Sequence, residues 1–426
     1  MLGCILCTIC MPIPTKGAHV RKRSRRTRRL STTDYHQFQV REATVGDRVF
    51  QFVSKPGIAF WYRADTDTQL LADCVQLLPQ QKVLCVGCRH GLLGAIIADR
   101  LPDAELWLLD SNVVAVRAAQ RTVALHGLSQ AKVLLSDALW KVRDQRFDQV
   151  LINLPRGRAL VNQLILDAFH VLNASGHLYL AGGNREGIKS HAKTVDRVFG
   201  NAEVARLGGR HRVISAAKQA ADIPSHIVDE LNPAYYDYIE FDVPVRGRSY
   251  HIVSKPGIFS WDRLDAGTRT LLDHLEISEN DTILDLGTGC GIIGVVAATL
   301  APRGHAYLVD AHVAAVNASK RTIAANNITN ATALLSDVAS DVRHIAFDIV
   351  ATNLPFHLGI KTEYRVALQF IKDAHAVLKV GGHLCLVANR FLKYEPFITE
   401  TFGNCHTIFS DNRYKVLKAL KKSHGL

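Results

Sequence analysis

The chain has 426 residues, about three times the length of a typical domain, so two or more domains are expected. Hydrophobic residues make up 48% of it and charged residues 21%, an ordinary globular composition that excludes a wholly disordered chain. The formal net charge is +12, but eight of the positive charges lie in residues 1–33, which contain no acid, so the rest of the chain carries only +4.

Residues 1–33 combine an apolar start with a basic run from Arg21 to Arg29. Such a segment cannot bury a core, so we expect a disordered arm, with Arg23 and Arg26 among the residues that contact RNA phosphates. The alternatives are a solvated tail without a partner and an organellar transit peptide. The basic run follows the apolar start, which is the wrong order for a secretory signal.

The nine cysteines, an odd number spread thinly over the chain, favour a reducing compartment, and we expect a cytoplasmic protein. Cys4, Cys7 and Cys10 form a Cys-x-x-Cys-x-x-Cys run, but no later Cys/His cluster completes a zinc site, so no metal is expected. No stretch approaches the roughly 18 consecutive apolar residues that span a bilayer, so no membrane association is expected either. We expect a monomer.

An internal repeat at an offset of 200 residues is the most informative feature of the chain. The run Val-Ser-Lys-Pro-Gly-Ile at 53–58 recurs at 253–258, and between residues 53 and 155 about 40 of roughly 100 positions are identical without a gap. After Pro155 the second copy has six extra residues. The predicted domains are a basic arm, a first copy, a linker and a second copy, over residues 1–33, 34–220, 221–237 and 238–426.

Within the second copy, short apolar runs bounded by turn residues predict strands, and longer stretches with helical spacing predict helices. Strands are expected at 282–286, 306–309, 331–335, 347–352 and 383–387, and helices at 292–300, 313–325 and 366–378. This alternation predicts an α/β fold with a mostly parallel sheet and helices on both faces. Each copy ends in two further strands that predict an antiparallel hairpin, at 203–207 with 213–217 and at 405–410 with 414–420.

The first strand of the second copy turns into a helix through the run Asp-Leu-Gly-Thr-Gly-Cys-Gly, which begins at Asp285 and contains Gly287, Gly289 and Gly291. Three glycines allow a sharp turn and the close approach of a ligand. Asp310 ends the next strand, where an acid can accept hydrogen bonds from ribose hydroxyls. The loop also fits a dinucleotide fingerprint, so an NAD enzyme is an alternative. Asp285 argues against it, because its carboxylate would repel a pyrophosphate but could hold an ammonium group.

Asn353, Leu354, Pro355 and Phe356 follow the fourth strand of the second copy, at the edge where open α/β sheets bind ligands. The lone pair of an exocyclic amine is delocalised into its ring, which makes the nitrogen a poor nucleophile. Two neutral acceptors, the Asn353 side chain and a neighbouring backbone carbonyl, could take its hydrogens and direct the lone pair, while Phe356 stacks on the base. The run predicts methyl transfer to such an amine; a plain strand-end turn with a core phenylalanine is the alternative.

With these residues the chain resembles the class I S-adenosylmethionine-dependent methyltransferases, and within them the tandem-domain ribosomal RNA guanine-N2 methyltransferases of the small-subunit methyltransferase C type. The resemblance covers nearly everything after the basic arm and implies two tandem Rossmann-like domains. Its motifs are Pro-Gly-Ile-Phe-Ser at 256–260, Leu-Asp-x-Gly-Thr at 264–268, the glycine run, Asn-Leu-Pro-Phe-His at 353–357, Val-Ala-Asn at 387–389 and Tyr-Lys-Val at 414–416.

The resemblance also implies roles for particular residues. Asp285 and the three glycines would form the S-adenosylmethionine loop, with Asp310 on the ribose and Asp337 on the adenine amino group. Asn353 would lie beside both the cofactor and the target base, and His357 would contact the substrate. The family usually has proline where this chain has Leu354, but any residue can supply the backbone carbonyl.

The implied activity is methylation of the guanine N2 amino group in ribosomal RNA, with 16S RNA or the small ribosomal subunit as the expected partner. Adenine-N6 and protein glutamine methylation are the alternatives with the same tetrapeptide. A non-catalytic RNA-binding or ribosome-assembly protein is an alternative of another class, and it would require the second copy to be damaged.

The first copy has lost the residues to which these roles are assigned. Cys85 replaces the aspartate before the glycines, Arg89 replaces the middle glycine and Arg156 replaces the stacking phenylalanine. The first copy is therefore predicted to be a degenerate methyltransferase domain. Arg89 and Arg156 are either recruited for phosphate contact or exposed and solvated. Three further polar residues are retained and indicate descent rather than use: Asp110, Asp137 and Asn153.

Overall fold

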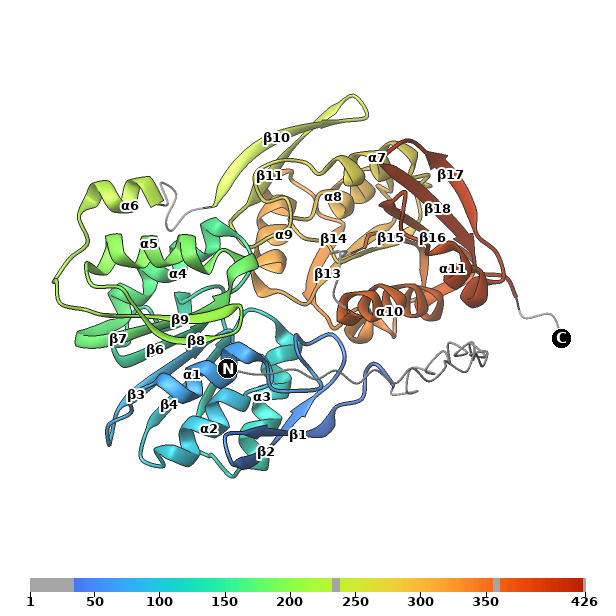
Figure 1. Ribbon diagram of the computed structural model, residues 1–426. Coiled ribbons are helices and arrows are strands. Elements are labelled where there is room, and N and C mark those ends of the chain that lie inside the picture. Colours follow the sequence, from blue (N-terminus) through green and yellow to red (C-terminus); the bar gives the residue numbers. More distant parts are fainter. Residues whose placement is uncertain (1–33, 232–237, 355–360, 424–426) are drawn as a thin grey trace, which may run out of the picture. The chain divides into compact units, whose positions relative to one another are not determined.

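A computed structural model describes residues 34–231, 238–354 and 361–423. The chain divides into two compact units, Met1–Asp34 and Tyr35–Leu426, and the first lies almost entirely outside the described residues. Within the second unit, residues 35–231 are called here the first half and residues 238–423 the second half (Figure 1). The two have the same succession of α-helices and strands, except that the first half ends in one further α-helix.

Each half contains a seven-stranded sheet, in the order β5-β4-β3-β6-β7-β9-β8 in the first half and β14-β13-β12-β15-β16-β18-β17 in the second. In both sheets the first five strands of this order run parallel, and the last two form an antiparallel hairpin. The predicted fold class is thereby confirmed.

The strands of the first sheet are β3 (Lys82–Val86), β4 (Glu105–Asp110), β5 (Lys132–Leu135), β6 (Phe147–Asn153), β7 (Leu172–Gly183), β8 (Glu203–Gly208) and β9 (His211–Ala217). Those of the second sheet are β12 (Thr282–Leu286), β13 (His305–Asp310), β14 (Ala331–Leu335), β15 (Phe347–Asn353), β16 (Leu378–Asn389), β17 (His406–Ser410) and β18 (Tyr414–Leu420).

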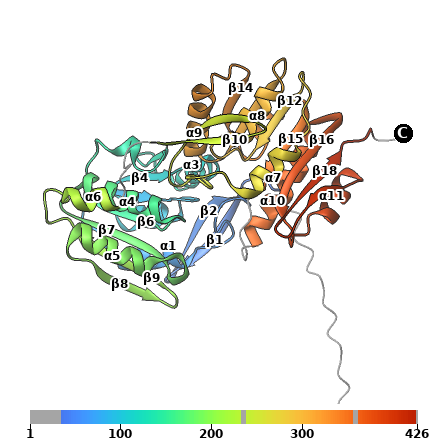
Figure 2. The ribbon, with the colours of Figure 1, turned by 90° about the horizontal axis from the view of Figure 1, so that it is seen from above.

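Helices cover both faces of each sheet (Figures 1 and 2). The first half contains α1 (Thr66–Cys74), α2 (Leu92–Arg100), α3 (Val113–Leu125), α4 (Arg158–Val171), α5 (Ile188–Phe199) and α6 (Ser225–Leu231). The second half contains α7 (Ala266–His274), α8 (Ile292–Leu300), α9 (Val313–Ala325), α10 (Lys361–Val377) and α11 (Glu395–Phe402). In the second half, α7 and α8 share one apolar cluster with the sheet, and α10 and α11 share another, so the sheet is buried between two layers.

Most predicted elements of the second half agree with the structure to within a residue or two, but several features differ. The helix α10 and the strand β16 each begin five residues before their predicted starts at 366 and 383. A two-stranded hairpin precedes each sheet, β1 (Gln39–Val45) with β2 (Arg48–Ser54) and β10 (Ile239–Val245) with β11 (Arg248–Ser254), and neither was predicted. The predicted linker contains α6, whose apolar residues pack against the core of the first half. Leu378 was assigned to a helix but begins β16, because it pairs with Phe347 across the sheet.

The two halves meet through equivalent loops. Asn112 and His312 form an isolated antiparallel bridge. On either side of it the Val113 N–H donates to the Ala311 carbonyl (2.8 Å), and the Val313 N–H donates to the Ser111 carbonyl (2.9 Å). The loop after β4 therefore binds the loop after β13. These reciprocal contacts relate the two halves by an approximate two-fold axis.

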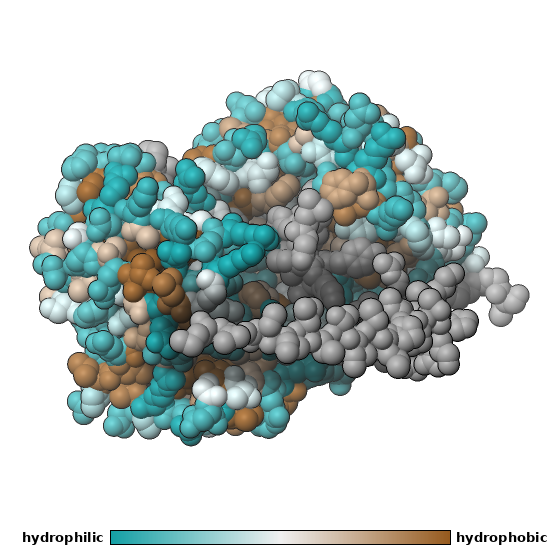
Figure 3. Space-filling model, in the orientation of Figure 1, coloured by the Kyte–Doolittle hydropathy of each residue, from teal (hydrophilic) through white to brown (hydrophobic). Residues whose placement is uncertain are grey.

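The face shown in Figure 3 carries mostly hydrophilic side chains, with hydrophobic ones in separate small groups. None of the helices in the described ranges combines the length and the apolar composition that crossing a membrane requires.

Candidate active site

The carboxyl ends of four parallel strands bring the predicted polar residues to one edge of the second sheet. Asp285 lies in β12, Asp310 ends β13, Asn353 ends β15 and Asp337 follows β14 by two residues. In an open α/β sheet, this edge is where ligands bind. Residues from four separate stretches of sequence therefore line one candidate site.

The glycine loop, which contains Gly287, Gly289 and Gly291, turns β12 into α8. The three glycines have φ angles of +81°, +59° and +92°, in the left-handed region that side chains disfavour. The Gly289 N–H donates to Asp310 Oδ2 (3.1 Å), which ties the loop to the next strand. Among the described residues, the atom nearest to a Cβ at Gly289 would be in the Ile258 side chain at 3.8 Å, an ordinary van der Waals distance, so none of them crowds this side of the loop.

Asp285 is fully buried beneath the glycine loop. Its Oδ2 accepts hydrogen bonds from the Thr288 hydroxyl (2.6 Å) and the Gly294 N–H (2.9 Å). Its Oδ1 has no hydrogen-bond partner among the described residues. Burial raises the pKa of Asp285 to about 7 in spite of these two donors. A buried carboxylate oxygen without a donor is costly, so this position favours a bound cation or donor.

Asp310 uses both carboxylate oxygens to hold backbone. Oδ2 accepts the Gly289 N–H, and Oδ1 accepts the His312 N–H (2.9 Å) at the start of α9. The Asp310 carbonyl accepts the Ser336 N–H (2.9 Å), which joins the loop after β14 to the same strand end. Each carboxylate oxygen has a second lone pair, so contact with ribose hydroxyls stays a prediction that this geometry accommodates.

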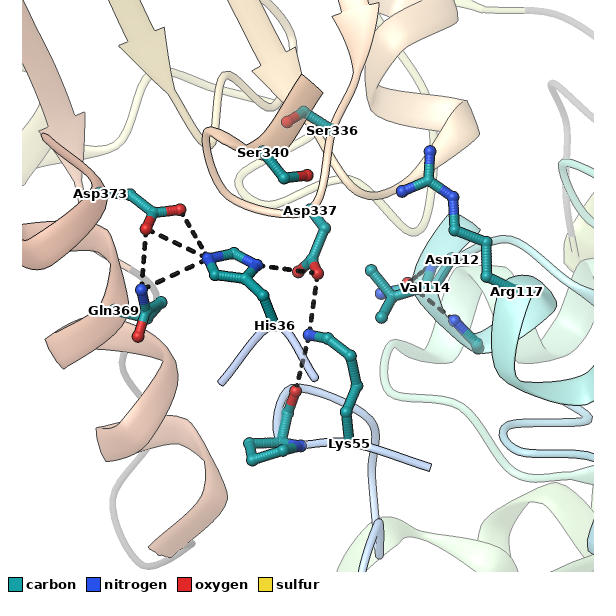
Figure 4. A network of polar contacts seen from close by, with 12 residues as sticks. His36, Lys55, Asn112, Val114, Arg117, Ser336, Asp337, Ser340, Gln369 and Asp373 are labelled. Carbon is teal, nitrogen blue, oxygen red and sulfur yellow. Dashed lines mark hydrogen bonds and ion pairs between the residues drawn. The ribbon is translucent and has the colours of Figure 1, made fainter. Parts of the chain in front are cut away.

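The carboxylate of Asp337 faces the first half. Lys55 Nζ lies 2.8 Å from Asp337 Oδ2, and His36 Nδ1 lies 3.5 Å from the same oxygen (Figure 4). Burial alone would raise the pKa of Asp337, but these two cations lower it. The sequence did not predict either partner, and contact of Asp337 with an adenine amino group stays a prediction.

The amide of Asn353 is held in one orientation by two residues at the start of α7. Its Nδ2 donates to Asp265 Oδ2 (3.0 Å) and to the Thr268 hydroxyl (2.9 Å). Because these two acceptors take both amide hydrogens, the Oδ1 atom of Asn353 is the atom of the side chain that can accept a hydrogen bond from a ligand. Asp265 and Thr268 belong to a motif that carried the family resemblance, yet the sequence indicated no role for them.

Leu354 follows Asn353 and is buried. The remaining predicted substrate residues lie outside the described residues: Pro355, Phe356, His357, Arg23 and Arg26. Their roles stay predictions.

At the equivalent edge of the first half, different side chains occupy the positions of Asp285 and Gly289. Cys85 is buried where the second half has its aspartate, and burial raises the pKa of this thiol to about 12. Arg89 forms an ion pair with Asp65 (2.6 Å), and its guanidinium lies 5.0 Å from the Phe60 ring centre. The Arg89 side chain is only 14% exposed, so the interpretation of a solvated arginine is wrong for this residue. Its charge is directed into the protein and towards Asp65; Arg156, in contrast, is exposed.

The three polar residues that the first half retains all make contacts within the protein, and their retention by descent, without a role in binding cofactor or substrate, stays an interpretation. Asp110 Oδ2 accepts the Arg89 N–H (2.9 Å), just as Asp310 holds the glycine loop. Asp137 pairs with Lys255 of the second half (2.9 Å). Asn153 Nδ2 donates to the Gly87 carbonyl (3.1 Å).

A single group of possible metal ligands occurs among the described residues. Atoms of Asp67, Glu186 and His211, in the first half, lie within 4.8 Å of one another. His211 Nδ1 and Asp67 Oδ1 are already hydrogen-bonded to each other at 2.8 Å. Cys4, Cys7 and Cys10 lie outside the described residues.

Comparison with known proteins agrees with this duplicated architecture. The family model "Methyltransferase small domain" matches the chain twice, over residues 49–215 and 249–418. A ribosomal RNA small subunit methyltransferase C from Hahella chejuensis is 32% identical over 328 residues, which cover 77% of this chain and 91% of the relative. A protein of the same name from Pseudomonas fluorescens is 30% identical over 357 residues, which cover 83% of this chain and 99% of the relative.

A solved structure extends the similarity to three dimensions. The 16S rRNA N2 G1207 methyltransferase RsmC of T. thermophilus, in complex with AdoMet and guanosine, superposes with a TM-score of 0.75 at 28% identity. The match covers 91% of this chain and 99% of that one, so it includes both halves and their arrangement. The chain therefore belongs to the methyltransferase small domain family and, within it, to the tandem-domain ribosomal RNA small subunit methyltransferase C enzymes.

Proposed function

We propose that this chain transfers a methyl group from S-adenosylmethionine to the N2 amino group of a guanine in small-subunit ribosomal RNA. The observation that carries the proposal is the match along nearly the whole chain to an enzyme of that activity, captured with AdoMet and guanosine. The second half is the proposed catalytic half, because it alone of the two keeps the glycine at 289 and the aspartate at 285.

The residues of the second half fit S-adenosylmethionine. The orphaned Oδ1 of Asp285 would receive the α-ammonium group, through an ordered water because the carboxylate is fully buried. The side of the loop at Gly289 that none of the described residues crowds would admit the cofactor chain against the backbone, and Asp310 would accept the ribose hydroxyls. When bound there, the cofactor supplies an electrophilic methyl group.

Asn353 and Leu354 would prepare the guanine amine. Asp265 and Thr268 fix the amide of Asn353, so that its Oδ1 can accept one amine hydrogen, and the Leu354 carbonyl would accept the other. Accepting both hydrogens draws the nitrogen towards tetrahedral geometry and directs its lone pair out of the ring plane. The methylated amine is acidic enough to lose its proton to water, so no strong base is needed at this position.

We further propose that Pro355 keeps Leu354 extended, that Phe356 stacks on the base and that His357 contacts the substrate. Arg23 and Arg26 of the basic arm would contact RNA phosphates without base specificity. The chain would act on RNA or on an assembling subunit in the cytoplasm, as a monomer.

Transfer of tritiated methyl groups to undermethylated small subunits, followed by nucleoside analysis, tests the activity. We expect N2-methylguanosine as the labelled product. Label in methyladenosine or in a protein glutamine, with none in guanosine, would contradict the proposal and favour one of the alternatives from the sequence.

Deletion of residues 1–30 tests the arm separately. We expect weaker RNA binding and a shallower salt dependence, because each lost phosphate contact lowers the logarithmic slope by about 0.9 or less. The labelled nucleoside should not change. An unaltered salt slope would contradict a role for Arg23 and Arg26.

A further inference from the structure

Two residues of the first half, Lys55 and His36, contact the loop that follows β14 in the second half (Figure 4). Lys55 Nζ lies 2.8 Å from Asp337 Oδ2 and donates to the Pro56 carbonyl (3.0 Å). His36 Nε2 lies 3.0 Å from Asp373 Oδ2 on α10, and its other ring nitrogen faces Asp337. Two cations of the degenerate half thus reach two acids of the catalytic half.

These contacts lie in a buried environment. Lys55 is fully buried, and its Nζ lies 3.9 Å from the centre of the Tyr35 ring, which itself belongs to an apolar cluster of the second half. A buried ammonium group is tolerated only when it is paired and hydrogen-bonded, so removal of either partner is costly. The position of Lys55 therefore constrains the position of the Asp337 carboxylate.

The tied loop is joined directly to the predicted cofactor site. The Ser336 N–H donates to the Asp310 carbonyl at 2.9 Å, so the loop is anchored to the strand end that would hold the ribose. On its far side, the Ala339 N–H lies 3.3 Å from Asp373 Oδ2, the same carboxylate that His36 contacts. His36 and Lys55 therefore hold the loop at Asp337 and, through Asp373, at Ala339.

The same ion pair occurs a second time, in the opposite sense. Lys255 Nζ of the second half lies 2.9 Å from Asp137 Oδ2 of the first half. Asp137 lies in the first half, in which Arg89 replaces the middle glycine of the loop and pairs with Asp65. The approximate symmetry thus provides two similar interface contacts, only one of which reaches a loop predicted to bind cofactor.

We infer that Lys55 and His36 are positioning residues. Through them the degenerate first half holds the loop after β14, which contains Asp337, in the orientation that binds the adenine of the cofactor. The inference rests on the proposed function. It assigns to the degenerate half a direct effect on cofactor affinity, in addition to any contribution it makes to stability or to RNA binding.

Three full-length variants test the inference: Lys55→Met, His36→Gln and, as the matched control, Lys255→Met. For Lys55→Met we expect the Kd for S-adenosylmethionine, measured by calorimetry, to rise on the order of tenfold, within the usual range of coupling between sites. The KM for the cofactor should rise in parallel, while kcat at saturating cofactor changes by less than about twofold, because the target-base site is untouched.

The control breaks the symmetry-related pair. Lys255→Met should also lower the melting temperature, though by no more than Lys55→Met does, because both remove one ion pair between the halves and the Lys255–Asp137 pair is the less buried of the two. Its Kd for S-adenosylmethionine should stay within about twofold of the wild-type value. His36→Gln removes a side chain that is not fully buried, and we expect a smaller rise in Kd than for Lys55→Met.

Equal rises in Kd for Lys55→Met and Lys255→Met would overturn the inference, because they would show general loosening of the interface. An unchanged or lower Kd in Lys55→Met would also overturn it. If Lys55→Met does not fold, His36→Gln decides, and wild-type affinity in that variant would overturn the inference. A wild-type protein that binds no S-adenosylmethionine would instead contradict the proposed function, on which the inference depends.

Discussion

The two halves keep the same backbone at the glycine loop although their side chains differ. Gly289 has a φ of +59° and donates its N–H to Asp310, and Arg89 has a φ of +53° and donates its N–H to Asp110. A left-handed conformation is unfavourable for arginine, so the surrounding structure must impose it. The loop geometry therefore depends on the hydrogen bond to the aspartate more than on the residue at this position.

The side chains then decide what the shared backbone can do. In the second half none of the described residues crowds the Cβ position of Gly289, and Asp265 orients Asn353. In the first half the Arg89 side chain pairs with Asp65, the counterpart of Asp265. The arginine at position 89 thus places a long side chain on the loop. It also pairs with Asp65, whose counterpart Asp265 orients the Asn353 amide in the second half. The difference shows that the same residue, Arg89, both fills the position of the loop glycine and forms a buried ion pair in the first half.

The largest expected effect comes from making the second half resemble the first. In Gly289→Arg we expect the new guanidinium to reach Asp265 and to abolish binding of S-adenosylmethionine, measured by calorimetry. Gly247→Arg is the matched control, because Gly247 also has a positive φ (+76°) and no atom within 4 Å of its Cβ position, in the hairpin of the same half. Full binding of S-adenosylmethionine by Gly289→Arg would show that an arginine at this loop position does not block the cofactor.

The next largest effect concerns the amide that the two halves orient differently. Asn353→Ala should lower kcat at saturating cofactor by about a hundredfold to a thousandfold, as for loss of one preorganised polar group in other active sites. The control is Asn153→Ala, which removes the amide bonded to the Gly87 carbonyl in the first half and should leave kcat unchanged. Similar losses in both variants would point to a structural cause.

The third effect is on the free energy of unfolding, and it concerns the Arg89–Asp65 ion pair of the first half. Burial favours the neutral acid, but Arg89 holds the pKa of Asp65 at about 2, so the pair is ionised. Arg89→Met leaves this buried carboxylate without its cation, and we expect the free energy of unfolding in urea to fall by about 3 kcal/mol. Arg185→Met, at an exposed position of the same half, should cost less than about 0.5 kcal/mol. Unchanged stability of Arg89→Met would show that the pair is not stabilising.

The smallest effect is a pH dependence of the contact between the halves. Burial opposes the charge of His36, but hydrogen bonds and charge interactions with Asp337 and Asp373 raise its pKa from 6.5 to about 9. A raised pKa contributes stability that is complete below pH 6.5 and is lost as the pH rises through about 9. The two acids have lowered pKa values, so their contribution is lost only as the pH falls below about 4.

We therefore expect wild type to exceed His36→Gln in unfolding free energy by roughly 1–2 kcal/mol at pH 6.5, after allowance for solvent screening, with the difference disappearing by about pH 10. Urea unfolding of both proteins across this range measures it. Among the described residues, Lys55, Gln369, Arg343 and Tyr35 also contact these two acids. Burial and the two acids raise the pKa of Tyr35 well above its usual value, so this phenol stays neutral across the pH range. A difference that stays constant with pH would show that His36 is neutral in the folded protein.

The sequence was sufficient for the fold where local signals agreed with the tertiary structure. The repeat, the apolar periodicity and the glycines predicted β12, α8 and α9 at their observed bounds. It failed at Leu378, because an apolar residue at the junction of a helix and a strand satisfies both patterns and only pairing with Phe347 decides between them. It also failed at α6, which is too short to show a period and is held by packing on the first half.

For the candidate site, the sequence by itself determined which half keeps the cofactor loop, because a missing carboxylate or a missing glycine is visible in the residue type. Asp285 and Gly289 stand out in this way, because Cys85 and Arg89 replace them in the first half, whereas Asp310 and Asn353 were predicted from their places at strand ends. The structure brings all four to one edge of the second sheet. What only the tertiary structure decided is where the side chains point. Arg89 turns to Asp65, and Lys55 crosses to Asp337 in the other half. Residue type reveals the chemistry that a position can perform, whereas a long side chain selects its partner through burial and distance, which are properties of the folded chain.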